Sequence, residues 1–97
     1  GGDPFEQAKA FAVLAQEAKK LNLNIMTYTG YTYEYLVKNA SRHRGWNSLL
    51  VETDILVDGK FEWSKKNLLL KFRGSENQRI IDINRTKAEN RLVIFDA

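Results

Sequence analysis

The order of helix and strand patterns in the first sixty residues limits the fold more than any other feature of this sequence. Asp3 is suited to cap a helix and Pro4 to open it, and small or apolar residues then recur on one face as far as Leu21. The patterns that follow predict a strand, two helices and a second strand, over residues 25–27, 32–41, 46–52 and 54–59. This alternation predicts an α/β fold in which parallel strands are joined by right-handed crossovers.

Three apolar runs in the second half of the chain read as strands. They are "NLLLKF", "QRIIDI" and "RLVIFDA", at residues 67–72, 78–83 and 91–97. The polar segment "NRTKAEN", residues 84–90, separates the last two and is expected to be a hairpin loop. The sequence therefore predicts one domain over residues 1–97, with a parallel sheet extended by a C-terminal β-hairpin.

Composition excludes several classes of function. The chain contains no cysteine, so it has no disulfide, no thiol nucleophile and no thiolate ligand for a metal or an iron–sulfur cluster. We predict no metal site. The net charge of +3 is mild and spread along the chain, which permits an anionic ligand but does not favour nucleic acid. No signal peptide or membrane-spanning run is visible, so the expected location is the cytoplasm, without a membrane partner.

Three short polar motifs fall at the ends of predicted strands or directly before the first helix. They supply the candidate ligand-binding residues Gly1, Gly2 and Asp3 in "GGDP", Thr27 and Thr29 in "TYTGY", and Asp58 and Lys60 in "DGK". Because ligands bind beyond the C-terminal ends of the strands in such sheets, we expect the three motifs to form one shared site. Paired glycines let a backbone approach a ligand, hydroxyls bind polar groups, and a carboxylate with an ammonium can hold a zwitterion such as an amino acid. Each motif also has a plain interpretation, as a cloning remnant with a helix cap, a turn, or a solvated "DG" turn.

Two further segments are rich in polar or basic side chains. In "FRGSENQR", the residues Arg73, Ser75, Asn77 and Gln78 could bind phosphate or a protein segment, or form a plain surface loop. In "SRHRGW", basic residues lie beside Trp46, which could contact single-stranded nucleic acid. A basic loop with Trp46 packed on the core is the preferred interpretation. His43 has no cysteine or serine partner nearby, so it receives no catalytic role.

Four of these segments occur in an order that resembles a known family. "GGDP", "LNIMTYTGYTYEYL", "TDILVDGKF" and "LLLKFRGSENQRIIDI" resemble the activating proteins of anaerobic ribonucleoside-triphosphate reductase, over roughly residues 1–83. These are radical S-adenosylmethionine (SAM) enzymes, related to the activating enzyme of pyruvate formate-lyase. The resemblance implies a partial (βα) barrel of the radical SAM type.

The resemblance also implies roles for the candidate residues. Gly1, Gly2 and Asp3 match a Gly-Gly-acid motif that holds the amino group of SAM, and Thr27 and Thr29 fall near the SAM. Asp58 and Lys60 resemble a pair that approaches its methionine end. The segment with Arg73, Ser75, Asn77 and Gln78 is expected to face the protein partner.

The family implies a complete reaction that this chain cannot carry out by itself. A [4Fe–4S] cluster bound by Cys-x-x-x-Cys-x-x-Cys binds SAM and cleaves it reductively, with electrons from a donor such as flavodoxin. The resulting radical takes a hydrogen from a glycine of the large reductase subunit. Because the cysteines are absent, we expect "GGDP" to be native sequence and the chain to be the inactive C-terminal portion of a larger activase. The alternative is a cysteine-free α/β module that binds a nucleotide or a protein.

Overall fold

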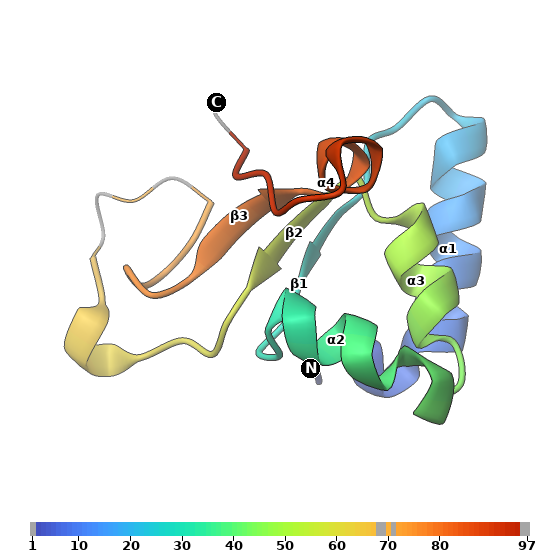
Figure 1. Cartoon of the computed structure of the whole chain (residues 1–97). Coiled ribbons are helices and arrows are strands. Elements are labelled where there is room, and N and C mark those ends of the chain that lie inside the picture. The colour runs from blue at the N-terminus through green and yellow to red at the C-terminus, as the bar shows by residue number, and fades with distance from the viewer. Residues whose placement is uncertain (1, 68–69, 71, 96–97) are drawn as a thin grey trace.

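The computed structural model of this chain describes residues 2–67, 70 and 72–95. Short helices and strands alternate through the first sixty residues, and an extended arm separates the second strand from the third (Figure 1). The α-helices are α1 (Ala8–Lys20), α2 (Tyr33–Asn39), α3 (Trp46–Glu52) and α4 (Ile83–Glu89). The strands are β1 (Met26–Tyr28), β2 (Ile55–Asp58) and β3 (Arg79–Asp82), and 3₁₀ turns span Pro4–Gln7, Ala40–Arg42 and Trp63–Lys65.

The three strands form one mixed sheet in the order β1-β2-β3. β1 pairs with β2 in parallel, with Thr27 opposite Leu56, whereas β3 runs antiparallel to β2, with Ile81 opposite Leu56. The predicted α/β class is therefore confirmed. The described strands form a small mixed sheet that is not closed into a barrel, and the expected parallel pairing holds for β1 and β2, whereas β3 is antiparallel. Among the described residues, no strand pairs with the outer edge of β1.

The core lies between the sheet and the helices. α1 and α3 lie side by side at one side of the sheet (Figure 1). Phe5 and Trp46 meet edge to face, with ring centroids 5.9 Å apart, and the Trp46 indole N–H donates to the Phe5 carbonyl at 2.7 Å. The prediction that Trp46 packs on the core is confirmed, because its side chain is 3% exposed.

The second half of the chain departs from the sequence prediction at residues 84–90. The expected hairpin loop is the helix α4, capped by the Asp82 side chain, which accepts from the Arg85 N–H at 2.9 Å. Asn90 ends the helix in the left-handed conformation. The predicted loop is wrong because it was inferred from the apolar runs on either side, whereas the cap residues Asp82 and Asn90 mark the two ends of a short helix.

The other two predicted strands fall partly outside the described residues, at positions 68, 69, 71, 96 and 97. Of the rest, residues 67, 70 and 72 belong to no strand, and Ile94 forms a single antiparallel bridge with Ile81. Strand 78–83 is confirmed as β3. Across the described ranges, no helix combines the length and apolar character needed to cross a membrane.

Candidate functional site

A shallow pocket of about 370 Å³ lies at the C-terminal ends of β1 and β2. Because the two strands are parallel, the segments that follow them emerge at the same edge of the sheet. The start of the chain reaches the same place, since Asp3 precedes the first helical turn. The pocket is lined by Gly2, Asp3, Pro4, Tyr28, Thr29, Gly30, Gly59, Lys60, Phe61 and Gln78.

The Asp3 carboxylate joins the start of the chain to the end of β1. Its Oδ1 accepts from the Phe5 N–H at 3.0 Å, which caps the first turn as the sequence predicts. Its Oδ2 accepts from the Thr29 hydroxyl at 2.9 Å and from the Gly30 N–H at 2.8 Å. A carboxylate has about four acceptor positions, so these three bonds leave Asp3 able to accept one more donor. A ligand ammonium is a donor of that kind.

Lys60 supplies the positive charge in the pocket. Its side chain is exposed, and within the described part of the chain it forms no ion pair. Its backbone is held by the loop that contains Asn77, because the Lys60 carbonyl accepts from the Asn77 side-chain amide at 2.8 Å. The neighbouring Gly59 has a φ of 98° and its carbonyl accepts from the Gln78 side chain at 2.9 Å. A ligand carboxylate in the pocket would meet a cation whose main chain is already ordered.

The loop "RGSENQ" is built from its own hydrogen bonds. Arg73 donates to the carbonyls of Gln78 and Glu76, at 2.7 and 3.0 Å, and the Gln78 Oε1 accepts from the N–H groups of Gly74 and Ser75. The buried Ser75 hydroxyl accepts from the Glu62 N–H at 3.3 Å. The four residues predicted to face a partner thus shape the loop that supports residues 59–62, and their binding to a partner stays a prediction.

Asp58 is buried and does not line the pocket. Its carboxylate is 1% exposed and accepts from Arg79 at 3.0 and 2.5 Å and from the Tyr33 N–H at 2.7 Å. Arg79 also binds Glu34, so the guanidinium lies between two carboxylates. Hydrogen bonds to Asp58 and then Glu34 raise the pKa of Arg79, and the Arg79 bond lowers the pKa of Glu34. Contact between Asp58 and a ligand stays a prediction.

The structure therefore brings together Gly2, Asp3, Thr29 and Lys60, and separates Thr27 from them. The Thr27 hydroxyl is buried and hydrogen-bonded to the Thr53 hydroxyl at 2.9 Å. It lies in the lining of a different, apolar pocket beside α1. Gly1 lies outside the described residues.

Sequence reasoning missed Arg79 and the aromatic side of the pocket, formed by Tyr28 and Phe61. Arg79 is opposite Asp58 in the β2–β3 register, so an opposite-charge cross-strand pair was the available signal. That signal needs the register, which the sequence does not provide. Phe61 directly follows Lys60, and a Cβ on Gly74 would come within 2.9 Å of its ring. The ring therefore packs closely on the loop.

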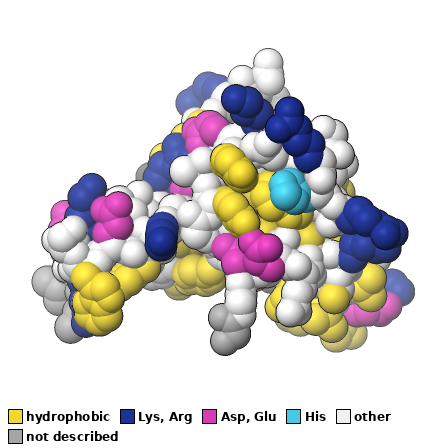
Figure 2. Space-filling view, turned by 90° about the horizontal axis from the view of Figure 1, so that it is seen from below, with side chains coloured by type: hydrophobic (Ala, Val, Ile, Leu, Met, Phe, Trp, Pro, Cys, Tyr) yellow, Lys and Arg dark blue, Asp and Glu magenta, His cyan; other side chains and the backbone are white. Residues whose placement is uncertain are grey.

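The basic side chains near His43 do not form a continuous surface (Figure 2). His43 stacks on Trp46 with ring centroids 3.9 Å apart. In Figure 2 the histidine lies beside hydrophobic side chains, and Lys and Arg side chains form separate groups rather than a continuous stripe. This arrangement does not add support for nucleic-acid binding, which prefers a continuous basic surface.

The donor set decides which cofactor these residues can hold. The chain has no thiolate, and the described residues contain no group of three or more His, Asp or Glu side chains placed to hold a metal ion. They do not fit a [4Fe–4S] cluster. The pocket does fit the amino-acid end of a small ligand, because Asp3 can accept from an ammonium and Lys60 can donate to a carboxylate.

Comparison with known proteins gives independent evidence for the family of this chain. The family model described as "4Fe-4S single cluster domain" matches residues 1–81. The anaerobic ribonucleoside-triphosphate reductase-activating protein of Pasteurella multocida (strain Pm70) is 34% identical over 85 residues, which cover 82% of this chain and 51% of the relative. The chain thus spans about half the length of this curated relative. No solved structure matches the chain.

Proposed function

Because the chain belongs to the 4Fe-4S single cluster domain family and is a homologue of anaerobic ribonucleoside-triphosphate reductase-activating protein, we propose that its pocket binds the methionine end of SAM. The observation that carries this proposal is the placement of Asp3 and Lys60 around one pocket at the strand ends. The amino group of SAM donates to the Asp3 carboxylate, and its carboxylate accepts from Lys60. Gly2 has nothing within 4 Å of where a Cβ would stand, so ligand atoms can approach its backbone.

The radical chemistry of the family needs donors that these residues do not supply. We propose that a cysteine-bearing segment outside the 97 residues holds the cluster, and that the 97-residue chain binds SAM weakly and has no activity alone. Weak affinity follows because a partial site orders the ligand with few contacts. The proposed role in the whole protein is to position SAM for activation of the reductase, with the loop containing Arg73 and Gln78 toward the large subunit.

Calorimetric titration tests the pocket directly. SAM is compared with 5′-methylthioadenosine, which has the same nucleoside but no amino-acid group. We expect only SAM to bind measurably, and we expect Lys60→Met to weaken SAM binding at least about tenfold, because a charge-assisted hydrogen bond contributes about 1.5–3 kcal/mol and 1.4 kcal/mol is tenfold.

Lys65→Met is the matched control, since Lys65 is an exposed lysine of the same arm that pairs with Glu62 and does not line the pocket. Equal binding of the two ligands, or unchanged binding by Lys60→Met, contradicts the proposal. In that case the alternative, a binding module for a nucleotide or a protein, becomes the better interpretation.

A further inference from the structure

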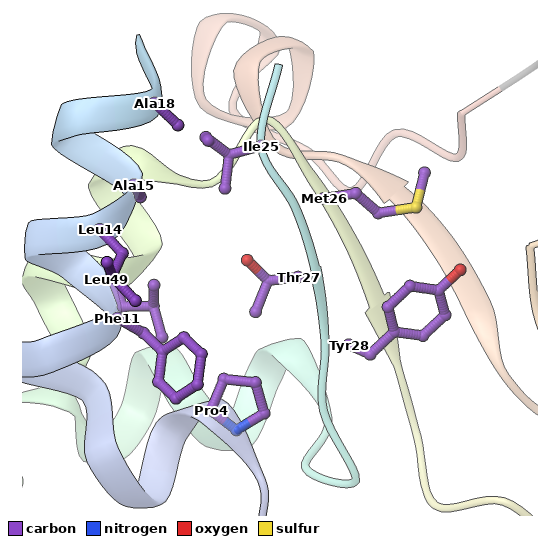
Figure 3. A pocket seen from close by; sticks show the side chains of 10 residues that line it. All are labelled: Pro4, Phe11, Leu14, Ala15, Ala18, Ile25, Met26, Thr27, Tyr28 and Leu49. Atoms are coloured by element: carbon purple, nitrogen blue, oxygen red, sulfur yellow. The ribbon is translucent and has the colours of Figure 1, made fainter. Parts of the chain in front are cut away.

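Lys60 is held in the pocket in a different way from the other residues around it. The Asp3 carboxylate is fixed by the three hydrogen bonds that it accepts. Tyr28 belongs to β1 and points to the side of the strand that is turned away from α1 (Figure 3). Lys60 belongs to no helix or strand, because β2 ends two residues before it. Its position therefore depends on what holds the loop of residues 59–62.

Two side-chain amides hold the two peptide groups that flank the Lys60 Cα. The carbonyl before this Cα, that of Gly59, accepts from the Gln78 side chain at 2.9 Å. The carbonyl after it, that of Lys60, accepts from the Asn77 side chain at 2.8 Å. Because a residue has only two soft backbone dihedrals, one on each side of its Cα, fixing both peptide groups sets the direction in which the Lys60 side chain leaves the main chain.

The two amides differ in their relation to the pocket. Gln78 lines it and also accepts from the N–H groups of Gly74 and Ser75, so its side chain serves the loop and the pocket together. Asn77 does not line the pocket, and its described side-chain bond is the one to the Lys60 carbonyl. Any effect of Asn77 on a ligand therefore has to pass through Lys60.

The Asn77 amide is only half used. Its Oδ1 is buried and accepts no hydrogen bond from the residues that the structure describes. A buried acceptor without a partner costs free energy of the same order as one hydrogen bond returns, so this amide gives the folded chain little or no net stability. An apolar side chain of the same size would avoid that cost. Residues that break a packing rule in this way are concentrated at functional sites.

We propose that Asn77 is a positioning residue for ligand binding, which holds the main chain of Lys60 so that the ammonium meets the carboxylate of an amino-acid ligand. The inference rests on the proposed SAM pocket and adds to it a residue from outside the lining. Its physical basis is preorganisation, because a main chain that is ordered before binding loses less conformational freedom when the ligand arrives. The glycine before Lys60 makes such a bond more useful, since glycine has the most backbone freedom to lose.

The first test needs no ligand. The order parameter of the Lys60 N–H, measured by NMR relaxation, should be near the rigid value of about 0.85 in the wild type and fall below about 0.6 in Asn77→Leu. The urea midpoint of Asn77→Leu should be unchanged or higher, because the unpaired acceptor is removed together with the bond. Asn77→Ala removes the same bond without adding an apolar side chain and should show the same drop in order. An unchanged order parameter in both variants overturns the proposal.

The second test is a double-mutant cycle with SAM, followed by NMR titration, which can measure weak binding. Asn77→Leu should weaken SAM binding about fivefold in the wild type. In Lys60→Met it should change binding less than about twofold, because the side chain that it positions is gone. Equal losses in the two backgrounds would show that Asn77 does not act through Lys60, and would overturn the proposal.

Asn39→Leu is the matched control, because the Asn39 side chain also donates to a backbone carbonyl, that of Tyr35 at 2.9 Å, and does not line the pocket. It should leave both the order of Lys60 and SAM binding unchanged. The two proposals fail in different ways. Absence of SAM binding by the wild type overturns the proposed function and this inference with it, whereas wild-type binding that Asn77→Leu leaves unchanged overturns only the positioning role.

Discussion

Replacement of Arg79 by methionine should destabilise the fold far more than removal of one of its two partners. The guanidinium donates to Asp58 at 3.0 and 2.5 Å and to Glu34 at 2.6 and 3.1 Å. The two carboxylates differ in environment, because the Asp58 side chain is 1% exposed and that of Glu34 is 63% exposed. Arg79→Met would leave the buried carboxylate with the Tyr33 N–H as its remaining donor.

Breaking a buried ion pair in this way costs roughly 3–5 kcal/mol. The Arg79 side chain is 32% exposed, so water can reach part of the site, and we expect about 2–4 kcal/mol here. Glu34→Gln removes only the exposed pair and should cost less than about 1 kcal/mol. The double variant Asp58→Asn/Arg79→Met should recover about 1 kcal/mol or more relative to Arg79→Met, since no charge then stays buried.

Urea unfolding followed by circular dichroism measures these differences as shifts of the midpoint at constant slope. Arg79→Lys is the conservative control, because it keeps the charge and loses the two-pronged bond, and should fall between the wild type and Arg79→Met. If Glu34→Gln and Arg79→Met cost the same, or if the double variant is no more stable than Arg79→Met, the argument from burial is refuted.

Two further predictions concern Tyr31 and Gly45. The Tyr31 hydroxyl donates to Glu6, and this bond raises the pKa of Tyr31 to about 12 from 10.0, so its contribution to stability is present below pH 10 and is lost as the pH rises toward 12. Tyrosine titration by NMR should show this pKa falling toward 10 in Glu6→Gln; an unchanged pKa would disprove the cause. Gly45→Ala should lower the free energy of unfolding by about 2 kcal/mol or more, because φ is 86° and the new Cβ would lie 2.6 Å from the backbone nitrogen of Lys9. Gly30→Ala, with no contact closer than 3.7 Å, is its control in the same urea assay and should change stability by less than about 1 kcal/mol.

Local signals in the sequence were enough to predict the elements of the first sixty residues. Asp3 caps the 3₁₀ turn Pro4–Gln7 that leads into α1, Thr32 caps α2, and the predicted helix 46–52 has the same bounds as α3. Such caps depend on residues two or three positions apart, which a sequence shows directly. The same kind of signal was present for α4 in Asp82 and Asn90, and was outweighed by the apolar runs on either side.

The geometry of the site depends on contacts between distant residues, and these could not be predicted. That Asp3 and Lys60 share a pocket was expected from strand ends, which meet at one edge of a parallel sheet. The bond from Thr29 to Asp3 spans 26 positions, and the bond from Arg79 to Asp58 spans 21. No local pattern reports such pairs. Thr27 was expected at the same site as Thr29, but its hydroxyl is hydrogen-bonded to that of Thr53, 26 positions away.

The shortness of β1 sets a threshold for what can pair with it. Met26 and Tyr28 alternate with the residues that bond to β2 and so offer four backbone groups at the outer edge, and each hydrogen bond contributes only about 0.5–1.5 kcal/mol net. Four such bonds give about 2–6 kcal/mol, whereas association of two free molecules costs about 4–15 kcal/mol in lost motion, so the backbone alone gives little or no net affinity for a passing strand. A strand whose side chains suit the apolar pocket between β1 and α1 gains the difference, and an arbitrary strand does not. A three-residue edge is therefore selective, which reduces the risk of amyloid-like pairing that a longer bare edge would carry.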